Sequence, residues 1–333
     1  MAKIKVKDQI LSTLNENKGT YYSGQDLADK LSVSRTAVWK AIERLREEGF
    51  SIVGSTNLGY ALDEKTDILD KASIESMLSK EALSFYRLEC VKEIGSTNDA
   101  VKERGLLEAE GLCIVAESQT KGKGRRGRSF FSPDSTGLYL SVLLKPTLSF
   151  SDAILITTAA SVAAIKACYE TNTSLKEDEL GIKWVNDIFL NGKKISGILT
   201  EGSLSMETGL LDFAVLGIGF NLCPPKEGWP SEIEGIAGSL FEEPVNDSRN
   251  KLTAAFLNHF LPIYKKLPGT DYLSDYRKHQ LAIGKTVRVL DGNSNAREAF
   301  VSGVNDRCEL LVKYTDTNEE TPLSSGEISI RFN

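Results

Sequence analysis

Eight consecutive residues, 121–128, combine five basic side chains with three glycines. So many glycines rule out the basic face of a helix. Gly122, Gly124 and Gly127 spell G-x-G-x-x-G, but a dinucleotide-binding fold needs a helix directly afterwards, and residues 129–133 are Ser-Phe-Phe-Ser-Pro. A kinase glycine-rich loop is excluded because V-A-I-K, H-R-D and D-F-G are absent downstream. The segment therefore predicts a loop that binds a phosphorylated anion, with a solvated loop or a nucleic-acid patch as the alternative.

Strand-like apolar runs alternate with helices through residues 85–278, which predicts a central α/β domain with a mixed sheet. Helical patterns surround residues 153–169 and 252–266. Asn191 and Gly192 lie between two apolar runs, and this dipeptide favours a tight antiparallel hairpin. The hairpin would bring Lys194 into the sheet.

Residues 1–64 predict three helices followed by a hairpin. Ser23 and Asp26 resemble a capping box for the second helix, and Ser34 would cap a third over residues 35–48. Strand-like residues 50–53 and 58–62 then flank a turn. This order is that of a winged helix-turn-helix, whose third helix enters the DNA major groove.

The candidate DNA contacts lie at the start of that third helix: Arg35, Thr36, Trp39 and Lys40. Residues 1–63 carry 9 Lys and Arg against 8 Asp and Glu, a net charge of +1, whereas the remainder carries 31 against 38, a net of −7. Because this positive charge is weak, residues 1–64 could also be a helical module that binds another protein instead of DNA. The hairpin after the third helix favours DNA.

Two further segments complete the predicted organisation. Residues 65–84 are polar with few apolar residues, and we expect a linker helix there. Residues 279–333 read as short strands separated by turns rich in Gly, Asn and Asp, without a helical period. Such a pattern favours a small β-barrel.

Composition narrows the class of protein. Hydrophobic residues make up 41% of the chain and charged residues 26%, as in ordinary globular proteins. The charge-free residues 153–165 fall short of the roughly 20 apolar residues of a membrane span, and no signal peptide is evident, so we expect a cytoplasmic protein without membrane contact. Five scattered cysteines and two histidines argue against a disulfide framework, a zinc site or a Ser-His-Asp triad.

Three short segments place polar side chains at strand ends or turns, where a small ligand can be oriented. They are Gly-Ser-Thr-Asn at residues 95–98, Lys-Trp-Val-Asn-Asp at 183–187 and Gly-Ile-Gly-Phe-Asn at 217–221. Taken singly, the first reads equally as a helix cap and the third as glycines for tight sheet packing.

Together with the Q-x-x-G-x-G-R-R-G-R loop and a G-K-K-x-S-G-I-L hairpin at residues 192–199, these motifs resemble one family. It is the biotin protein ligases, of the bifunctional type that also represses the biotin operon. The resemblance covers essentially the whole chain. It implies that ATP and biotin, with Mg²⁺, give biotinyl-5′-AMP, and that biotin then passes to one lysine of a biotin carboxyl carrier protein of acetyl-CoA carboxylase or another biotin-dependent carboxylase. It also implies an SH3-like C-terminal barrel and a ligand-promoted homodimer on operator DNA.

The resemblance further implies roles for single residues. Lys194, Arg125 and Lys183 would be catalytic. Biotin would be bound by Ser96, Thr97, Gln119, Gly122, Lys123, Arg125 and Lys194. ATP and the adenylate would be bound by Arg128, Lys183, Asn186, Asp187 and Asn221, with Asp187 near the metal-bound triphosphate.

Two residues depart from the family pattern. Lys123 stands where Arg is frequent, and Val185 stands where Pro is usual. Two other functions remain open at this point: a lipoate-type ligase, and a winged-helix metabolite sensor without ligase activity.

Overall fold

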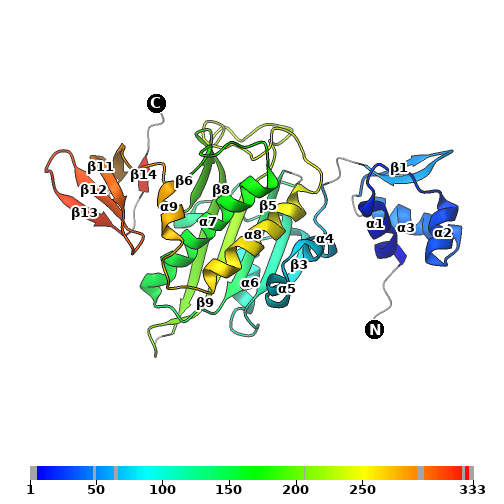
Figure 1. The fold of residues 1–333 in the computed structure, drawn as a ribbon, viewed down its shortest axis with the longest axis horizontal. Helices are drawn as coiled ribbons and strands as arrows, with labels where there is room; N and C mark the ends of the chain where they lie inside the picture. Colours follow the sequence, from blue (N-terminus) through cyan, green and yellow to red (C-terminus); the bar gives the residue numbers. More distant parts are fainter. Residues whose placement is uncertain are drawn as a thin grey trace. The chain divides into compact units, whose positions relative to one another are not determined.

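The structure is a computed structural model of the 333-residue chain. It describes residues 6–47, 50–63, 67–134, 136–205, 207–290, 296–324 and 327–329. The chain divides into two compact units (Figure 1). The first comprises residues 1–68 with 245–247, and the second residues 69–244 with 248–333.

The first unit has three helices and a hairpin, as the sequence predicts. The elements are α1 (Val6–Glu16), α2 (Gly24–Leu31), α3 (Arg35–Glu47), β1 (Ile52–Ser55) and β2 (Gly59–Leu62), with β1 and β2 antiparallel. Ile10, Leu14, Leu27, Ile42 and Leu45 are fully buried in one core. The helix-turn-helix with a following wing-like hairpin is therefore confirmed.

Local hydrogen bonds explain where these helices begin. Ser23 Oγ accepts from Asp26 N–H at 3.0 Å and Ser23 N–H donates to the Asp26 carboxylate at 3.2 Å, which is the predicted capping box. Ser34 Oγ accepts from Ala37 N–H at 3.2 Å. Residues 48 and 49, at the predicted end of the third helix, lie outside the described residues.

A seven-stranded mixed sheet forms the centre of the second unit. Its strands are β3 (Arg87–Ile94), β4 (Leu112–Gln119), β5 (Gly137–Leu144), β6 (Leu180–Lys183), β7 (Asp187–Leu190), β8 (Lys193–Leu204) and β9 (Leu211–Asn221). The order is β3-β4-β5-β9-β8-β7-β6, with β3 and β4 parallel and the other pairs antiparallel. Asn191 and Gly192 have φ of 50° and 76°, as a tight β7–β8 hairpin requires.

Helices cover both faces of this sheet. The long helices α7 (Ala153–Thr171) and α8 (Ser248–Tyr264) lie side by side on one face (Figure 1). On the other, α6 (Thr97–Arg104) packs Val101 into a second apolar cluster. Within the described residues, Phe150–Thr171, which joins the 3₁₀ turn η2 (Phe150–Asp152) to α7, has the length and composition of a membrane helix, but 67% of its most apolar window is buried inside the protein. It is therefore a core helix of a globular unit.

The structure has two short helices where the sequence predicts one linker helix over residues 65–84. They are α4 (Lys71–Met77) and α5 (Lys80–Phe85), and both belong to the second unit. Ile74 and Ala82 are fully buried. Asn258 of α8 accepts from Ser79 N–H at 2.9 Å and donates to Met77 C=O at 3.0 Å. The few apolar residues of this segment thus anchor it to the second unit.

A five-stranded antiparallel sheet ends the chain. Its strands are β10 (Thr286–Leu290), β11 (Ala296–Val304), β12 (Leu310–Tyr314), β13 (Glu320–Leu323) and β14 (Glu327–Ser329), in the order β13-β12-β11-β10-β14. Helix α9 (Leu273–Lys278) precedes it, and Arg277 Nε donates to Val304 C=O at 2.8 Å. Trp184 Nε1 donates to Cys308 C=O at 2.9 Å. The β-rich C-terminal segment is thus confirmed and is joined to the central sheet.

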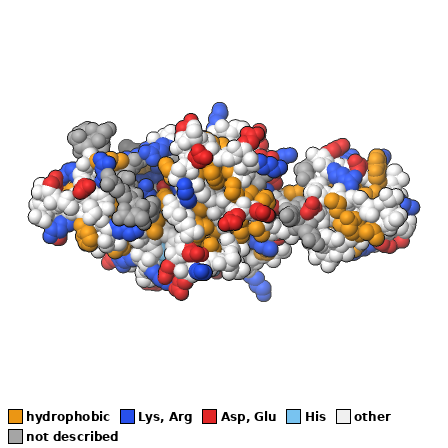
Figure 2. Space-filling view, turned by 90° about the horizontal axis from the view of Figure 1, so that it is seen from above, with side chains coloured by type: hydrophobic (Ala, Val, Ile, Leu, Met, Phe, Trp, Pro, Cys, Tyr) orange, Lys and Arg blue, Asp and Glu red, His pale blue; other side chains and the backbone are white. Residues whose placement is uncertain are grey.

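The surface charge and the cysteines can be compared with what the sequence predicts. The chain has a net charge of −6, and Figure 2 shows basic and acidic side chains interspersed over the visible face. The cysteines are free thiols, and Cys113, Cys168, Cys223 and Cys308 are buried. Cys90 is half-buried, and this burial raises the pKa of its thiol to about 12.

Candidate active site

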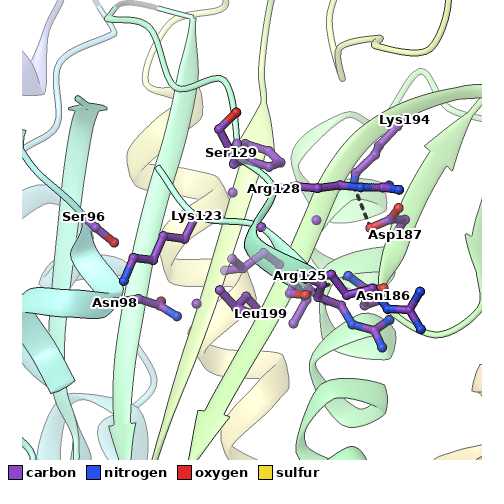
Figure 3. Close-up of a pocket in the computed structure, with 18 of the residues that line it drawn as sticks. Ser96, Asn98, Lys123, Arg125, Arg128, Ser129, Asn186, Asp187, Lys194 and Leu199 are labelled. Carbon is purple, nitrogen blue, oxygen red and sulfur yellow. Dashed lines mark hydrogen bonds and ion pairs between the residues drawn. The ribbon is translucent and has the colours of Figure 1, made fainter. Parts of the chain in front are cut away.

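A cavity of about 360 Å³ lies in the second unit (Figure 3). Its walls come from the start of α6, the end of β4 with the basic loop, the β6–β7 connection, β8 and β9, and from Leu290 of β10. Most residues that the sequence analysis singled out meet here. Those in the lining are Ser96, Thr97, Gln119, Lys123, Arg125, Arg128, Lys183, Asn186, Asp187 and Lys194.

Two of the predicted ligand residues, Gly122 and Asn221, are not part of the lining. Gly122 has no room for a side chain, because a Cβ would lie 2.4 Å from Phe130 O and 2.5 Å from Ser132 Oγ. Asn221 is buried, and its amide donates to Gly238 C=O at 3.0 Å. Both residues therefore shape segments that border the cavity.

The basic loop folds back on itself around a short 3₁₀ turn, η1 (Arg125–Gly127). Gly124 N–H donates to Arg128 C=O at 2.7 Å, and Phe130 N–H donates to Gly122 C=O at 3.0 Å. Gly127 has φ of 75°, which glycine adopts without strain. The glycines thus allow a tight loop that presents Lys123 and its three arginines to the cavity.

Arg125 is held by a neighbouring motif. Its Nη1 donates to Asn186 Oδ1 at 2.9 Å, and Asn186 Nδ2 donates to Ile198 C=O at 2.8 Å (Figure 3). Asn186 is buried and fixed to β8 on its far side. This contact ties the basic loop to the Lys-Trp-Val-Asn-Asp motif, two segments 61 positions apart in sequence.

Lys194 and Asp187 form an ion pair at the same end of the cavity, with Nζ 2.7 Å from Oδ1. The backbone around Lys194 is fixed too: its N–H donates to Ile236 C=O at 2.8 Å, and its C=O accepts from Gly238 N–H at 2.9 Å. Asp187 is the only acidic residue among the described residues that line the cavity. In the described chain, no group of three or more His, Cys, Asp and Glu side chains could hold a metal.

Neutral polar groups lie around the start of α6. Gln119 Oε1 accepts from Thr97 N–H at 2.9 Å and lies 3.1 Å from Thr97 Oγ1, and its Nε2 donates to Ser132 Oγ at 3.1 Å. Ser96 is buried and caps α6 through Asp99 N–H at 3.4 Å. One part of the cavity is therefore lined by amides and hydroxyls, while basic residues dominate another.

Lys123 of the basic loop lies beside the start of α6, near Ser96 and Asn98 (Figure 3). Its ammonium group hydrogen-bonds Asp99, and this contact raises the pKa of Lys123 above its usual value. Lys123 is half-exposed at the cavity, so its charge is present at neutral pH. The residue that departs from the family pattern thus keeps its positive charge at the expected place.

Phe130 is a side chain of the cavity wall that the sequence motifs did not single out. Its ring lies over two glycines of the sheet: a Cβ on Gly219 would be 2.6 Å from the ring, and one on Gly197 would be 3.2 Å from it. Lys194 Nζ lies 6.0 Å from the ring centre. The signal was present, because Phe130 follows the basic loop directly and Gly219 belongs to a motif already noted. Further lining residues outside the predicted set are Asn98, Arg126, Ser129, Trp184, Ile198, Leu199, Gly217, Ile218 and Leu290.

The candidate DNA contacts form an exposed surface of the first unit. Arg35, Thr36, Trp39 and Lys40 of α3 face solvent at least in part, and 52% of Trp39 is accessible. The opposite face of α3 is buried through Val38, Ala41, Ile42 and Leu45. The predicted contacts therefore share the solvent side of the helix.

Comparison with known proteins assigns the family. Residues 91–221 match the biotin/lipoate A/B protein ligase family, and residues 6–61 match an HTH domain. The chain is 30% identical over 326 residues to the bifunctional ligase/repressor BirA of Escherichia coli, covering 94% of each chain. This chain belongs to the bifunctional biotin protein ligases. BirA of Bacillus spizizenii is also 30% identical, over 318 residues that cover 92% of this chain and 94% of the relative.

A solved ligase structure is similar in fold to most of this chain. The biotin protein ligase from Aquifex aeolicus in complex with biotin and ATP superimposes with a TM-score of 0.59 at 26% identity, covering 75% of this chain and 100% of the other. Val185, the second departure of this ligase from its family pattern, is buried behind the cavity, and its C=O accepts from Tyr276 Oη at 2.9 Å.

Proposed function

We propose that this ligase condenses biotin with ATP to biotinyl-5′-AMP, and then transfers biotin to a lysine of a biotin carboxyl carrier protein. One observation carries the proposal: a single cavity joins an amide- and hydroxyl-lined part at Thr97 and Gln119 to a basic part at Arg125, Arg128 and Lys194. A neutral cyclic urea fits the first part. Carboxylate and phosphates fit the second.

The first step forms one bond and breaks one. A biotin carboxylate oxygen attacks the α-phosphorus of ATP, and the bond to the β-phosphate oxygen breaks to release pyrophosphate. Two anions must approach, so the chain acts by positioning them and by neutralising their charge. Lys194 would bridge the carboxylate and the α-phosphate, while Arg125, Arg128 and Lys183 would bind phosphates. No covalent bond to the protein is needed.

Magnesium fits this cavity as part of the nucleotide. Mg²⁺ is usually held by one or two carboxylates together with phosphate oxygens and water, and Asp187 is the carboxylate available in the described lining. When bound, the ion supplies positive charge to the triphosphate. Asp187 would hold it and Asn186 would orient the adjacent phosphate, while Asn221 would fix the segment beside the adenine.

The second step uses the carrier's lysine. Its neutral amine attacks the carbonyl carbon of the mixed anhydride, and the bond between that carbon and the phosphate oxygen breaks. AMP leaves with this oxygen, and the new amide nitrogen loses one proton to solvent. The basic loop stabilises the departing phosphate. Ser96, Thr97, Gln119 and Lys123 hold the biotin ring throughout, and Gly122 lets the loop close over it.

The same chain acts as a biotin-responsive repressor. The solvent-facing residues Arg35, Thr36, Trp39 and Lys40 would contact operator DNA. Because residues 1–63 carry a net charge of only +1, one copy binds weakly, and a homodimer promoted by biotinyl-5′-AMP would occupy two half-sites. The C-terminal sheet would be an SH3-like barrel, and the protein would work in the cytoplasm.

The decisive test is the product. Purified protein is incubated with Mg-ATP and either biotin or lipoate, and adenylates are identified by mass spectrometry. We expect biotinyl-5′-AMP and pyrophosphate in the incubation with biotin, and no adenylate in the incubation with lipoate. Lipoyl-AMP as the main product would favour the lipoate-type ligase, and no adenylate with either acid would favour a metabolite sensor.

A further inference from the structure

A chain of hydrogen bonds leads from a carboxylate on β8 to the cavity wall. Glu201 Oε2 accepts from Asn98 Nδ2 at 2.9 Å. Ser141 Oγ lies 2.6 Å from Asn98 Oδ1 and 2.7 Å from Thr97 Oγ1. Ser141 is fully buried, Asn98 and Thr97 are nearly so, and Glu201 itself does not line the cavity. The chain therefore connects Thr97 to a group that a ligand does not touch.

Glu201 is ionised at neutral pH. Burial alone would raise its pKa, but hydrogen bonds from Asn98 and Lys102 outweigh burial and lower the pKa below its usual value. Lys102 Nζ lies 2.9 Å from Oε1, the oxygen that Asn98 does not use. An ionised carboxylate only accepts hydrogen bonds. Asn98 must therefore turn its NH₂ group to Glu201 and its oxygen to Ser141.

The protons of the next two groups follow from this orientation. Asn98 Oδ1 carries no hydrogen, so the contact at 2.6 Å requires the single Ser141 proton. The contact between Ser141 and Thr97 then needs the Thr97 proton, and the other acceptor near that proton is Gln119 Oε1, at 3.1 Å. In both cases the Thr97 proton points into the protein. Thr97 therefore offers lone pairs, and no proton, to the cavity.

We propose that Glu201 is a positioning residue: it sets the direction of the Asn98–Ser141–Thr97 hydrogen bonds so that Thr97 accepts an N–H group of the ligand. The inference rests on the proposed function, in which that N–H belongs to the cyclic urea of biotin. It also assigns a source of selectivity. Lipoate carries a similar carboxylate but has no N–H to donate, so an acceptor at Thr97 favours biotin.

The geometry predicts what an isosteric amide would do. In Glu201→Gln, Lys102 needs an acceptor and takes the amide oxygen, which leaves the new NH₂ group facing Asn98. Asn98 then turns over and presents its own NH₂ to Ser141, and Ser141 donates to Thr97. Ser141 then no longer accepts the Thr97 proton, which is left with Gln119 Oε1, already the acceptor of Thr97 N–H, or with the cavity. A Thr97 proton turned towards the cavity opposes the ligand N–H.

The test compares three variants by biotin-dependent ATP–pyrophosphate exchange: Glu201→Gln, Lys102→Met, and the two combined. We expect Glu201→Gln to raise KM for biotin about tenfold, with KM for ATP and kcat within about threefold of the parent. Lys102→Met alone should leave KM for biotin unchanged. The double variant should recover most of the parental KM, because without Lys102 the introduced amide is free to turn its oxygen towards Asn98.

A merely structural role does not predict rescue by removing a second contact. A parental KM for biotin in Glu201→Gln, or a double variant as weak as the single one, would overturn the inference while leaving the ligase intact. If Glu201→Gln unfolds, Ser141→Ala decides: it cuts the chain at its middle and should raise KM for biotin about tenfold, and a parental KM would again overturn the inference. A parent protein without any biotin-dependent exchange would contradict the proposed function itself.

Discussion

Lys194 Nζ lies 2.7 Å from Asp187 Oδ1, and the pair joins the two strands of the β7–β8 hairpin at the basic part of the cavity (Figure 3). Both side chains are partly buried, so the pair holds the Lys194 ammonium towards the cavity before any ligand binds. The tight Asn191–Gly192 turn makes this possible, because it places β8 beside β7 with Lys194 two residues beyond the turn.

Replacing Lys194 tests its role in the adenylation step. In Lys194→Ala we expect the adenylation rate to fall about 100-fold or more, while Kd for biotin changes far less, because the charge matters most as carboxylate and α-phosphate approach. Pyrophosphate exchange and equilibrium biotin binding are measured on the same samples. Lys193→Ala is the matched control, since its Nζ contacts Gly235 C=O at 2.8 Å outside the cavity. Exchange at the parental rate in Lys194→Ala would refute this role.

Arg125 tests whether the loop retains the intermediate. Arg125→Gly removes the contact to Asn186 at 2.9 Å and one guanidinium from the cavity lining, where we propose that the phosphate binds. We therefore expect faster release of biotinyl-5′-AMP and biotinylation of bystander lysines. Released adenylate is quantified by mass spectrometry. The control is Lys121→Gly, in the same loop but not in the cavity lining, and release equal to that of this control would show that Arg125 does not act as a clamp.

Gly219 tests the packing of Phe130 on the floor of the cavity. In Gly219→Ala the new methyl would lie 2.6 Å from the Phe130 ring, so the ring must move into the cavity or the loop must open. We expect KM for biotin to rise about tenfold or more, at a cost in stability of about 1–3 kcal/mol. Gly235→Ala is the control, because its Cβ would meet no atom within 4 Å. A parental KM in Gly219→Ala would show that Phe130 lies outside the biotin path.

DNA binding by the first unit and ligation in the cavity should respond to different mutations. Arg35→Ala and Lys40→Ala change only solvent-facing side chains of α3. We therefore expect each to weaken the free energy of operator binding by about 1–3 kcal/mol, while the rate of biotin ligation stays at the parental value. Footprinting on the protein's own biotin-gene promoter, with and without biotin and ATP, measures the first effect. Sedimentation of the same samples measures dimerisation. A ligand-independent footprint, or a monomer that fills the site, would contradict the coupled repressor.

The sequence predicted correctly those elements that are stabilised by residues close together in the chain. The Ser23 capping box and the Asn191–Gly192 turn each depend on residues a few positions apart, and both are present. The segment 65–84 was misread because its helices are stabilised from outside: Asn258, about 180 positions away, holds the end of α4 and the start of α5. Sequence spacing carries no record of such a contact.

Among the cavity residues, too, those in sequence motifs were identified, and those defined by contacts between distant segments were not. Motif residues such as Lys194 and Arg125 were identified from the chain alone. Phe130 and Glu201 were not, because their surroundings come from segments far apart in sequence: the Phe130 ring lies over glycines of β8 and β9, and the Glu201 carboxylate is joined to Asn98 of α6 and, through it, to Ser141 of β5. Gly122 was assigned to biotin by the family resemblance, and in the structure it borders the cavity without lining it, with Phe130 and Ser132 filling the space beside its Cα.

The central claim is that one cavity holds both parts of the intermediate, and a crystal structure of this chain with biotinyl-5′-AMP tests it most directly. The account predicts the cyclic urea against Thr97 and Gln119, with a ring N–H directed at Thr97 Oγ1, and the phosphate within hydrogen-bond distance of Lys194 and a basic-loop arginine. An adenylate bound in the reverse orientation, or bound outside the residues that line this cavity, would contradict it.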